Sequence, residues 1–468
     1  MRFYKHKRYL SRVNRDASGY HQFPRYVVYP RNVREIQMVL RSEKSCDGVT
    51  IRAGGTGLGG ACLGKNIVCH VKHLKRTKYE SRSKYYFEAG ANIKTIRQLV
   101  QKNGHYFPSA PFHGKCCLSG VINTRAVGPY TYSFGYIDSY IDSMVVVLAD
   151  GTVVDTSKPL TNNIEMKLKK TIDLINTDEC LKQYIFSRPI SAGGFNLKSV
   201  MNQKTLTSAF HHLMIGSVGQ LGVLVSVRMT LPKMPLKGIF MLYPYQSFDH
   251  LNSLLLEIHN TKPFCIELLD REVADRIINT TDQALGYFVV HHQSAHDCLP
   301  SGKVLLEDGF LEKRSLALKH IFDEAMRHGL WIPSFLDDVS IHPKHTGEVL
   351  HDIDCYMNET SRRYCLYGHP GIGSLHLRVF LPKDQRDLEP MALDIFKIVN
   401  KYGGTMVGEH NLGFNRSWYL FKEREELFQL HKKIKTIFDP DYILANSVLK
   451  KRLQPYPINV KETLKDWV

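Results

Sequence analysis

Two glycine-rich stretches in the second half of the chain carry imidazole and carboxylate side chains at short spacing. His369 and His376 stand on either side of a glycine turn, and Glu409 directly precedes His410. The alternating run 375–380 predicts a strand, and a loop followed by a strand can turn both imidazoles toward one point. Two histidines and a carboxylate are a common ligand set for Zn²⁺, Mn²⁺ or Fe²⁺, and an adjacent histidine is suited to act as a base. The alternative interpretation is that the histidines are separate and that each is hydrogen-bonded within its own glycine-rich turn.

A second chemically suggestive stretch lies near the start of the chain, at residues 52–60. It holds five glycines and a threonine in nine residues, between predicted strands at 49–51 and 66–71. Such a loop lets the backbone approach a ligand closely and can point successive N–H groups toward a diphosphate. A Rossmann fingerprint would lead into a helix and a P-loop would end in Gly-Lys-Ser/Thr, and neither pattern is present. An ordinary structural loop therefore stays open as an alternative.

Further stretches of small residues follow in a fixed order. The first is 117–128. The second, 133–151, consists of a Tyr-Gly turn, a predicted buried strand and a hairpin signal, and the third is 216–223. Together with the loop at 52–60, this series resembles the FAD-linked oxidase superfamily of the vanillyl-alcohol-oxidase type. The resemblance implies non-covalently bound FAD, held by Arg52, Ala53, Gly54, Gly55, Thr56, Gly57, Gly59, Gly60, Ser119, Gly120, Asn123, Thr124, Gly128, Gly222 and Val223. Val218 departs from the usual Gly-Ser-Glu-Gly of the third segment.

The histidine stretches narrow the resemblance to one branch of that superfamily. They are similar to the Gly-His-x-Gly-Asp-Gly-Asn-Leu-His and Gly-Glu-His-Gly motifs of the D-lactate dehydrogenase, glycolate oxidase D subunit and D-2-hydroxyglutarate dehydrogenase branch. By this resemblance, His369, His376 and Glu409 are metal ligands and His410 is the catalytic base. Ile372 and Ser374 replace the usual Asp and Asn, and 411–413 and 445–447 also depart from the branch pattern.

The expected activity is oxidation of a D-2-hydroxy acid of the lactate, glycolate or 2-hydroxyglutarate type to the 2-oxo acid. A divalent metal, zinc or manganese with iron as a further option, lowers the pKa of the C2 hydroxyl, and hydride passes to the flavin. Candidates for the substrate carboxylate are Arg378, Lys344 and Arg314, with a solvated surface charge as the alternative for each. Two other functions stay open: a catalytically weakened flavoprotein that acts as a subunit or scaffold, and another flavin oxidase, such as a sugar or alditol oxidase.

The expected fold class is α+β, with three segments. Residues 1–232 form a two-subdomain FAD-binding domain, 233–400 form an α+β cap domain with the metal site, and 401–468 return to complete the active site and the FAD domain. A polar, helical insertion is expected within 156–205. The tract 291–296 invites a metal assignment, but a loop or strand end is the preferred interpretation, since no nearby carboxylate has a ligand-like spacing.

Composition indicates a basic surface and a reducing environment. The 468 residues carry a formal charge of +17, with Lys and Arg spread along the chain, which favours a solvated basic surface and, second, peripheral association with anionic lipid. Basic charge alone is weak support for nucleic-acid binding. Ten scattered cysteines contain no C-x-x-C pair, so no iron–sulfur module is encoded, and free thiols are expected. The electron acceptor is then a quinone, a cytochrome, a flavoprotein or a separate iron–sulfur subunit. The expected location is cytoplasmic, with peripheral attachment at the inner membrane as an option, or mitochondrial in a eukaryote.

Overall fold

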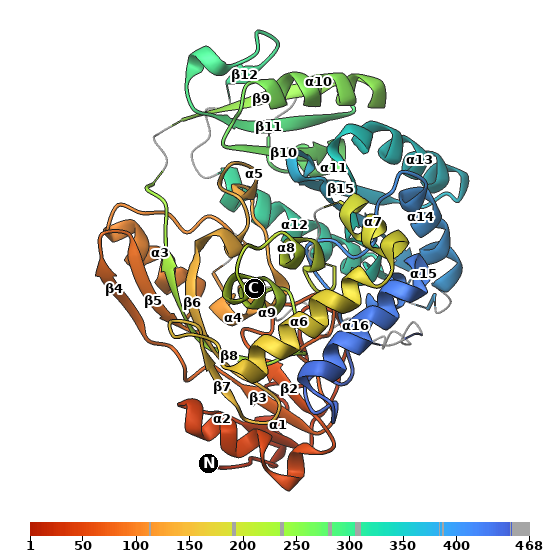
Figure 1. Cartoon of the computed structure of the whole chain (residues 1–468). Helices are drawn as coiled ribbons and strands as arrows, with labels where there is room; N and C mark the ends of the chain where they lie inside the picture. Colours follow the sequence, from red (N-terminus) through yellow and green to blue (C-terminus); the bar gives the residue numbers. More distant parts are fainter. Residues whose placement is uncertain are drawn as a thin grey trace.

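The computed structural model describes residues 1–111, 114–189, 193–234, 238–278, 283–304, 310–382, 384–385, 388–449 and 451. Within this part of the chain, strands form four sheets. Figure 1 shows the largest sheet at one end of the molecule and the sheets of the N-terminal half at the other end. The expected α+β class is confirmed.

A three-stranded parallel sheet carries the glycine loop. Its order is β1-β3-β2, and the loop connects β2 to β3. Helix α2 (Val33–Leu40) links β1 to β2 and begins after Asn32, whose side chain accepts a hydrogen bond from the Glu35 N–H. Around this sheet the elements are α1 (Lys7–Leu10), β1 (Tyr26–Val28), η1 (Glu43–Ser45), β2 (Val49–Arg52) and β3 (Ile67–His70).

A five-stranded antiparallel sheet, of order β4-β5-β8-β6-β7, lies next in the chain. The predicted hairpin at Asp150-Gly151 joins β6 to β7, and Gly151 has φ +81°, which glycine adopts without strain. The strands are β4 (Thr77–Ser81), β5 (Lys84–Glu88), β6 (Ile141–Val147), β7 (Val153–Asp155) and β8 (Val223–Thr230).

Helices connect and cover these strands. Within the small-residue stretch at 117–128, residues Leu118–Thr124 form the helix α4. The described part of the insertion at 156–205 is largely helical, as predicted, and its helix α6 lies beside α16 (Glu425–Phe438) in Figure 1. The helices are α3 (Ile93–Lys102), α4 (Leu118–Thr124), α5 (Thr131–Phe134), η2 (Ile137–Tyr140), α6 (Asn162–Asn176), α7 (Glu179–Ser187), α8 (Leu197–Met201) and α9 (Leu206–Met214).

A seven-stranded antiparallel sheet, of order β12-β9-β11-β10-β15-β16-β14, builds the second large unit. All seven residues of β11 (Gly286–His292) are buried, because both faces of the sheet are covered. Phe288 and Val290 pack in one hydrophobic cluster, and Tyr287 and Val289 pack in another. The other strands are β9 (Ile239–Tyr245), β10 (Cys265–Asp270), β12 (Lys303–Val304), β14 (Val339–Ser340), β15 (Tyr364–His369) and β16 (Ser374–Val379).

Helices and a short ribbon complete this unit. Strands β13 (Leu330–Trp331) and β17 (Leu381–Pro382) pair antiparallel beside helix α12. The helices are α10 (Phe248–Asn260), α11 (Arg271–Ala274), η3 (Ala295–Asp297), α12 (Phe310–Arg327), η4 (Ser334–Leu336), η5 (Pro343–His345), α13 (Thr346–Glu359), η6 (Pro370–Ile372) and α14 (Glu389–Lys401).

The three- and five-stranded sheets with their helices form the first unit of the chain. The C-terminal segment contacts this first unit again through α15 (Ser417–Glu423) and α16 (Glu425–Phe438). Leu444 forms a parallel bridge with Val49 of β2. The buried Lys435 ammonium donates to the carbonyl of Gln220 (3.0 Å) and pairs with Asp439 (2.6 Å). These contacts hold the segment beside the strand that precedes the glycine loop. The boundaries at 232 and 400 stay predictions.

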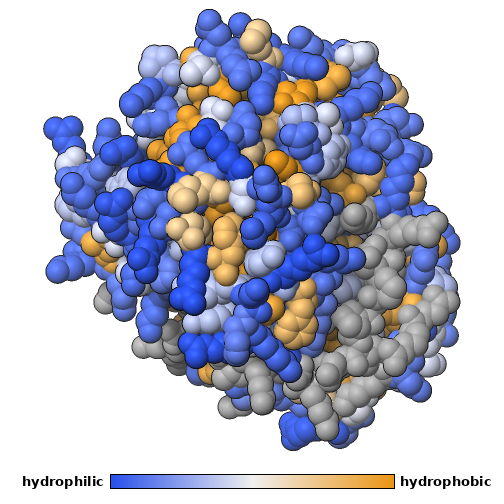
Figure 2. Space-filling view, turned by 90° about the horizontal axis from the view of Figure 1, so that it is seen from below, coloured by the Kyte–Doolittle hydropathy of each residue, from blue (hydrophilic) through white to orange (hydrophobic). Residues whose placement is uncertain are grey.

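The surface is hydrophilic over most of the face in Figure 2, with apolar side chains in scattered groups. In the part of the chain that the structure describes, none of the helices combines the length and apolar character that a membrane crossing requires.

Candidate functional site

One cavity of about 410 Å³ brings the two halves of the predicted site together. On the side of the first unit it is lined by Ala53, Gly54, Gly55, Thr56, Gly57, Ser119, Gly120, Asn123, Thr124 and Gly128. On the side of the seven-stranded sheet and the C-terminal segment it is lined by Arg314, His369, His376, Arg378, Glu409 and His410. Residues predicted to bind a cofactor therefore face the same space as those predicted to bind a metal.

Where the glycine loop packs against the backbone of residues 115–117, it leaves no room for a side chain. A Cβ at Gly54 would lie 2.8 Å from the carbonyl oxygen of Lys115, and Gly55 has φ +72°. Ser119 on α4 lines the same cavity, and its buried hydroxyl has no hydrogen-bond partner among the described residues. A narrow glycine-lined wall with an unsatisfied hydroxyl fits a polar dinucleotide such as FAD.

Six predicted site residues lie outside the lining of this cavity. Arg52 is buried and donates to the carbonyl of Val13 (3.4 Å) and to Cys62 Sγ (3.3 Å). Lys344 is exposed on η5 at the surface. Gly59 and Gly60, in the loop itself, pack against Leu412 and Phe414 of the C-terminal segment. Gly222 and Val223 lie at the start of β8, against β6.

Strands β15 and β16 position the two predicted metal-binding histidines. His369 ends β15, and His376 lies on β16 opposite Tyr367. His376 Nε2 is 3.0 Å from Glu409 Oε1, and His369 Nε2 is 3.9 Å from Glu409 Oε2. One ligand atom from each of the three lies within 4.8 Å of the other two. This spacing fits three protein ligands around one divalent cation, with further positions open.

Electrostatics in this triad favour the forms that bind a cation. Burial lowers the pKa of His376 to about 4, against the opposing charge of Glu409, so the imidazole is neutral at neutral pH. Burial alone would raise the pKa of Glu409, but the surrounding histidines, His376 first and then His410 and His369, together hold that pKa well below its ordinary value. Ser374, at a position where the motif departs from its branch, donates to Glu409 Oε2 at 3.0 Å.

His410 stands beside the triad and is held by two buried carboxylates. Its Nδ1 is 3.2 Å from Asp337 Oδ1 and 3.4 Å from Asp338 Oδ1, and its ring stacks on His376. Burial alone would lower the pKa of His410, but Asp337 and Asp338 raise it to about 9. A cation at the triad would oppose this shift by Coulomb repulsion. Nδ1 is engaged by Asp337, so Nε2, which is 3.4 Å from Glu409 Oε1, is the nitrogen on the side of the triad.

A second group of possible ligands shares His376 with the first. Asp337, His376 and His410 also offer atoms within 4.8 Å of one another. However, the Asp337 carboxylate ion-pairs with Arg378 and, at 2.5 Å, with Arg416, and both guanidiniums are buried. Asp337 is therefore already neutralised, which favours the triad with Glu409 for a cation.

Several residues of the site were missed by sequence reasoning. Glu267 on β10 is fully buried and lies 2.5 Å from His369 Nδ1 and 2.7 Å from Arg314 Nε. A glutamate inside the apolar run 264–269, and the Asp337-Asp338 pair after an apolar segment, were the available signals. Lys319 on α12 also lines the cavity, with Phe322 and Tyr367.

The first two histidines of the tract at 291–296 have a structural role. His291 and His292 are buried at the end of β11, as the preferred interpretation expected. His291 Nδ1 is 3.0 Å from the Tyr130 hydroxyl, and His292 Nε2 is 2.8 Å from the Tyr243 hydroxyl.

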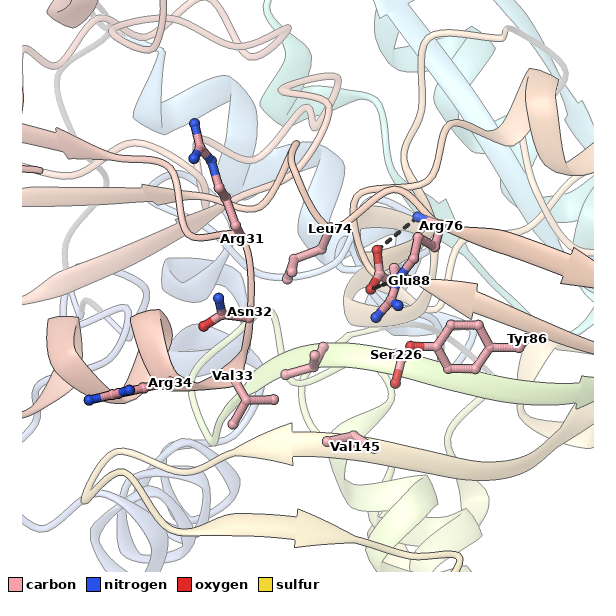
Figure 3. Close-up of a pocket in the computed structure, with 11 residues that line it drawn as sticks. Arg31, Asn32, Val33, Arg34, Leu74, Arg76, Tyr86, Glu88, Val145 and Ser226 are labelled. Carbon is pink, nitrogen blue, oxygen red and sulfur yellow. Dashed lines mark hydrogen bonds and ion pairs between the residues drawn. The ribbon is translucent and has the colours of Figure 1, made fainter. Parts of the chain in front are cut away.

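A second hollow lies between the start of α2 and the five-stranded sheet (Figure 3). Arg76 Nε donates to the Glu88 carboxylate at 2.8 Å, so this cation is neutralised there. Figure 3 shows the side chains of Arg31 and Arg34 extending away from the other lining residues. The hollow therefore offers no convergent set of chemical groups.

Comparison with known proteins defines the class. Residues 24–157 match the FAD binding domain family, and residues 306–448 match the family of FAD linked oxidases, C-terminal domain. Together with the fold and the glycine-lined cavity, these matches show that the chain belongs to the FAD-linked oxidases of the vanillyl-alcohol-oxidase type, as the motifs indicated.

Individual relatives align with most of this chain. A D-2-hydroxyglutarate dehydrogenase of Escherichia coli (strain K12) is 25% identical over 92% of this chain and 48% of its own length. A D-lactate dehydrogenase of Archaeoglobus fulgidus is 21% identical over 91% of both chains. The chain spans about half the length of the E. coli relative and of two further D-2-hydroxyglutarate dehydrogenases, from Haemophilus influenzae and Pantoea ananatis. A solved structure of alkyldihydroxyacetonephosphate synthase superimposes with a TM-score of 0.62 at 12% identity, over 95% of this chain and 81% of that chain, which shows a shared fold.

Proposed function

We propose that the protein is an FAD-dependent dehydrogenase that oxidises a D-2-hydroxy acid of the lactate, glycolate or 2-hydroxyglutarate type to the 2-oxo acid. The observation that carries this proposal is the shared cavity: the glycine loop and α4 line one side, and the triad and His410 line the other. The names of the E. coli and A. fulgidus relatives support the same substrate class.

A divalent metal, zinc or manganese with iron as the further option, is proposed at His369, His376 and Glu409. A bound metal supplies Lewis-acid polarisation of the substrate's C2 hydroxyl and carboxylate. The neutral imidazole of His376 and the ionised Glu409 are the forms that bind such an ion. Because the three ligands leave further positions open, a substrate could enter the coordination sphere without displacing a side chain.

With a cation at the triad to oppose the raised pKa of His410, this imidazole is proposed to accept the proton of the C2 hydroxyl at Nε2, while Asp337 holds Nδ1. General base catalysis of this kind typically contributes ~10²–10⁴-fold in rate. Bound FAD supplies the acceptor for the hydride that leaves C2. The chain's own contribution is to hold the hydroxy acid between the triad and the glycine-lined wall, so that the C2–H bond faces that wall.

The substrate carboxylate needs a cation whose charge is not already neutralised. Arg378 is paired with Asp337 and donates to the Tyr367 hydroxyl, so its guanidinium is committed. Arg314 pairs with Glu267 through Nε, but its buried Nη2 has no hydrogen-bond partner among the described residues. Half-buried Lys319 has no ion-pair partner within the described part of the chain. Lys319 and Arg314 Nη2 are therefore the proposed carboxylate anchors.

The electrons must then leave the flavin for a separate acceptor. The proposed acceptors are a quinone, a cytochrome, another flavoprotein or a separate iron–sulfur subunit. The +17 charge supports association with an anionic surface, either an acidic partner or a peripheral membrane site. A cytoplasmic location, or a mitochondrial one in a eukaryote, is proposed from the resemblance to the D-2-hydroxyacid dehydrogenase branch.

The visible spectrum of the FAD-loaded, metal-supplemented protein tests the proposal. Under anaerobic conditions, D-lactate, glycolate or D-2-hydroxyglutarate should bleach the ~450 nm flavin band, which reports hydride transfer. L-lactate and L-2-hydroxyglutarate should leave the band unchanged. A stable flavin band that no hydroxy acid bleaches would instead indicate the weakened, non-catalytic flavoprotein.

A further inference from the structure

A fully buried carboxylate lies behind the proposed metal site. Glu267 is in the middle of β10, between the apolar side chains of Ile266 and Leu268, and no part of it is exposed. An ionised carboxylate in such a place is costly unless it is paired and hydrogen-bonded. Glu267 has two partners: its Oε1 is 2.5 Å from His369 Nδ1, and its Oε2 is 2.7 Å from Arg314 Nε.

We propose that Glu267 is a positioning residue for the metal site, which fixes the tautomer and the direction of His369. This inference rests on the proposed metal site at His369, His376 and Glu409. A carboxylate beside Nδ1 accepts the Nδ1–H, so that the lone pair is on Nε2. Nε2 is the nitrogen that faces Glu409, at 3.9 Å. Carboxylate partners of this kind also raise the basicity of a metal-binding histidine.

Within the triad, this arrangement distinguishes His369 from His376. His410 has its own carboxylate partner in Asp337. His376 Nδ1 is buried and has no hydrogen-bond partner among the described residues. Of the two histidines in the triad, His369 is thus the one whose outer nitrogen is held by a carboxylate.

Glu267 also connects the triad to a cation of the cavity. Arg314 belongs to α12, and its guanidinium lies 5.1 Å from the centre of the Tyr367 ring. Glu267 therefore fixes, from one carboxylate, both a proposed metal ligand and a proposed carboxylate anchor. Loss of the Glu267 charge should weaken the metal site and release Arg314 at the same time.

Metal affinity, measured without any substrate, tests the proposal. The FAD-loaded protein is stripped of metal and titrated with Zn²⁺ in competition with a chromophoric chelator. Glu267→Gln keeps the size of the side chain but removes its charge, and we expect it to weaken Zn²⁺ binding ~10–100-fold. Glu267→Asp keeps the charge but draws the carboxylate back by one methylene, and we expect an intermediate loss. Flavin content and melting temperature show that each variant is folded.

Glu423→Gln is the matched control. Glu423 is also a buried carboxylate paired with an arginine, at 2.5 Å from Arg188 Nε, and it lies outside the cavity lining. The Zn²⁺ affinity of the Glu423→Gln variant should stay within about threefold of the wild-type affinity. Wild-type affinity in both Glu267 variants, an equal loss in Glu423→Gln, or no Zn²⁺ binding by the wild type would each overturn the inference. Because no hydroxy acid is used, failure of the proposed oxidation would leave this result unaffected.

Discussion

At the scale of single residues, buried ion pairs decide which charged groups of the cavity are available. Arg378 faces the cavity, but Asp337 neutralises it at close range. Lys319 lines the same cavity without a described ion-pair partner. A substrate carboxylate gains most from a cation that does not first have to leave another anion.

Replacement of Lys319 should therefore affect substrate binding more than chemistry. Lys319→Met keeps much of the apolar stem and removes the charge. A hydrogen bond to a charged group contributes about 1.5–3 kcal/mol, so KM should rise roughly 10- to 150-fold while kcat changes little. Steady-state kinetics with the best D-hydroxy acid measure this. Lys344→Met, at an exposed position outside the cavity, should behave as wild type. An unchanged KM in Lys319→Met would remove Lys319 from the substrate site.

One departure from the motif of the branch has a clear structural reason. Asn411 adopts φ +55°, a conformation that asparagine tolerates better than other residues with a Cβ. Its amide nitrogen donates to the carbonyl of Gly216 at 2.9 Å, and its oxygen accepts from the Gly194 N–H at 3.3 Å. Asn411 thus fastens the segment after His410 to two other loops. Val218 also has φ +55°, and its N–H donates to the carbonyl of Asn123 at 2.9 Å, but no contact among the described residues explains the valine side chain there.

At the scale of elements, helix α16 holds a loop through a neutral histidine. His431 is 1% exposed, its Nδ1 donates to the carbonyl of Leu427 at 2.8 Å, and its Nε2 accepts from the Phe195 N–H at 2.8 Å. Burial lowers the pKa of His431 to about 4. Only the neutral ring can accept the Phe195 hydrogen bond, so protonation would break this contact.

The stability of the chain should consequently fall on mild acidification in a way that depends on His431. Between pH 6.5 and 4 the unfolded state binds a proton at this histidine and the folded state does not, so unfolding becomes easier as the pH falls. From pH 7 to pH 5 the pKa difference corresponds to about 2 kcal/mol. Urea unfolding of the wild type and of His431→Gln at both pH values measures the difference. Equal pH dependence in the two proteins would contradict this assignment.

Local pattern was sufficient to predict many elements, because strands, caps and glycine turns depend on neighbouring residues. The strands on either side of the glycine loop and the hairpin at Asp150-Gly151 follow from such patterns. The partners of the site residues could not be predicted in this way. Glu267 reaches His369 across 102 positions and Asp337 reaches His410 across 73, so only the fold brings them together. For the same reason, charge alone could not show that Lys344 is exposed at the surface while Lys319 lines the cavity.

At the scale of the whole molecule, the cavity lies where the first unit, the seven-stranded sheet and the C-terminal segment meet. FAD in this place would contact all three, so its binding should stabilise the entire chain. At a concentration 100 times its dissociation constant, a ligand of the folded state adds about 2.7 kcal/mol. Thermal melts of the flavin-free protein should therefore shift upward as FAD is added.

The Gly57→Val variant tests whether this shift in melting temperature comes from FAD bound at the glycine loop. A Cβ at Gly57 would have no protein atom within 4 Å, yet Gly57 lines the cavity. The variant should fold with the melting temperature of the flavin-free wild type, but the valine would occupy space needed by the cofactor. We expect its response to FAD to be lost or strongly reduced. A full FAD shift in Gly57→Val would place the cofactor away from this loop.

The measurement that tests the central claim most directly is anaerobic flavin reduction with and without the metal triad. The FAD-loaded wild type is mixed with D-lactate or D-2-hydroxyglutarate before and after removal of metal by a chelator, and in parallel with His369→Ala. We expect one D-acid to bleach the flavin band, the chelator to abolish the reaction, Zn²⁺ or Mn²⁺ to restore it, and His369→Ala to retain FAD but react at least ~10²-fold more slowly. Bleaching that is insensitive both to the chelator and to His369→Ala would contradict the claim that the triad and the flavin act on one substrate.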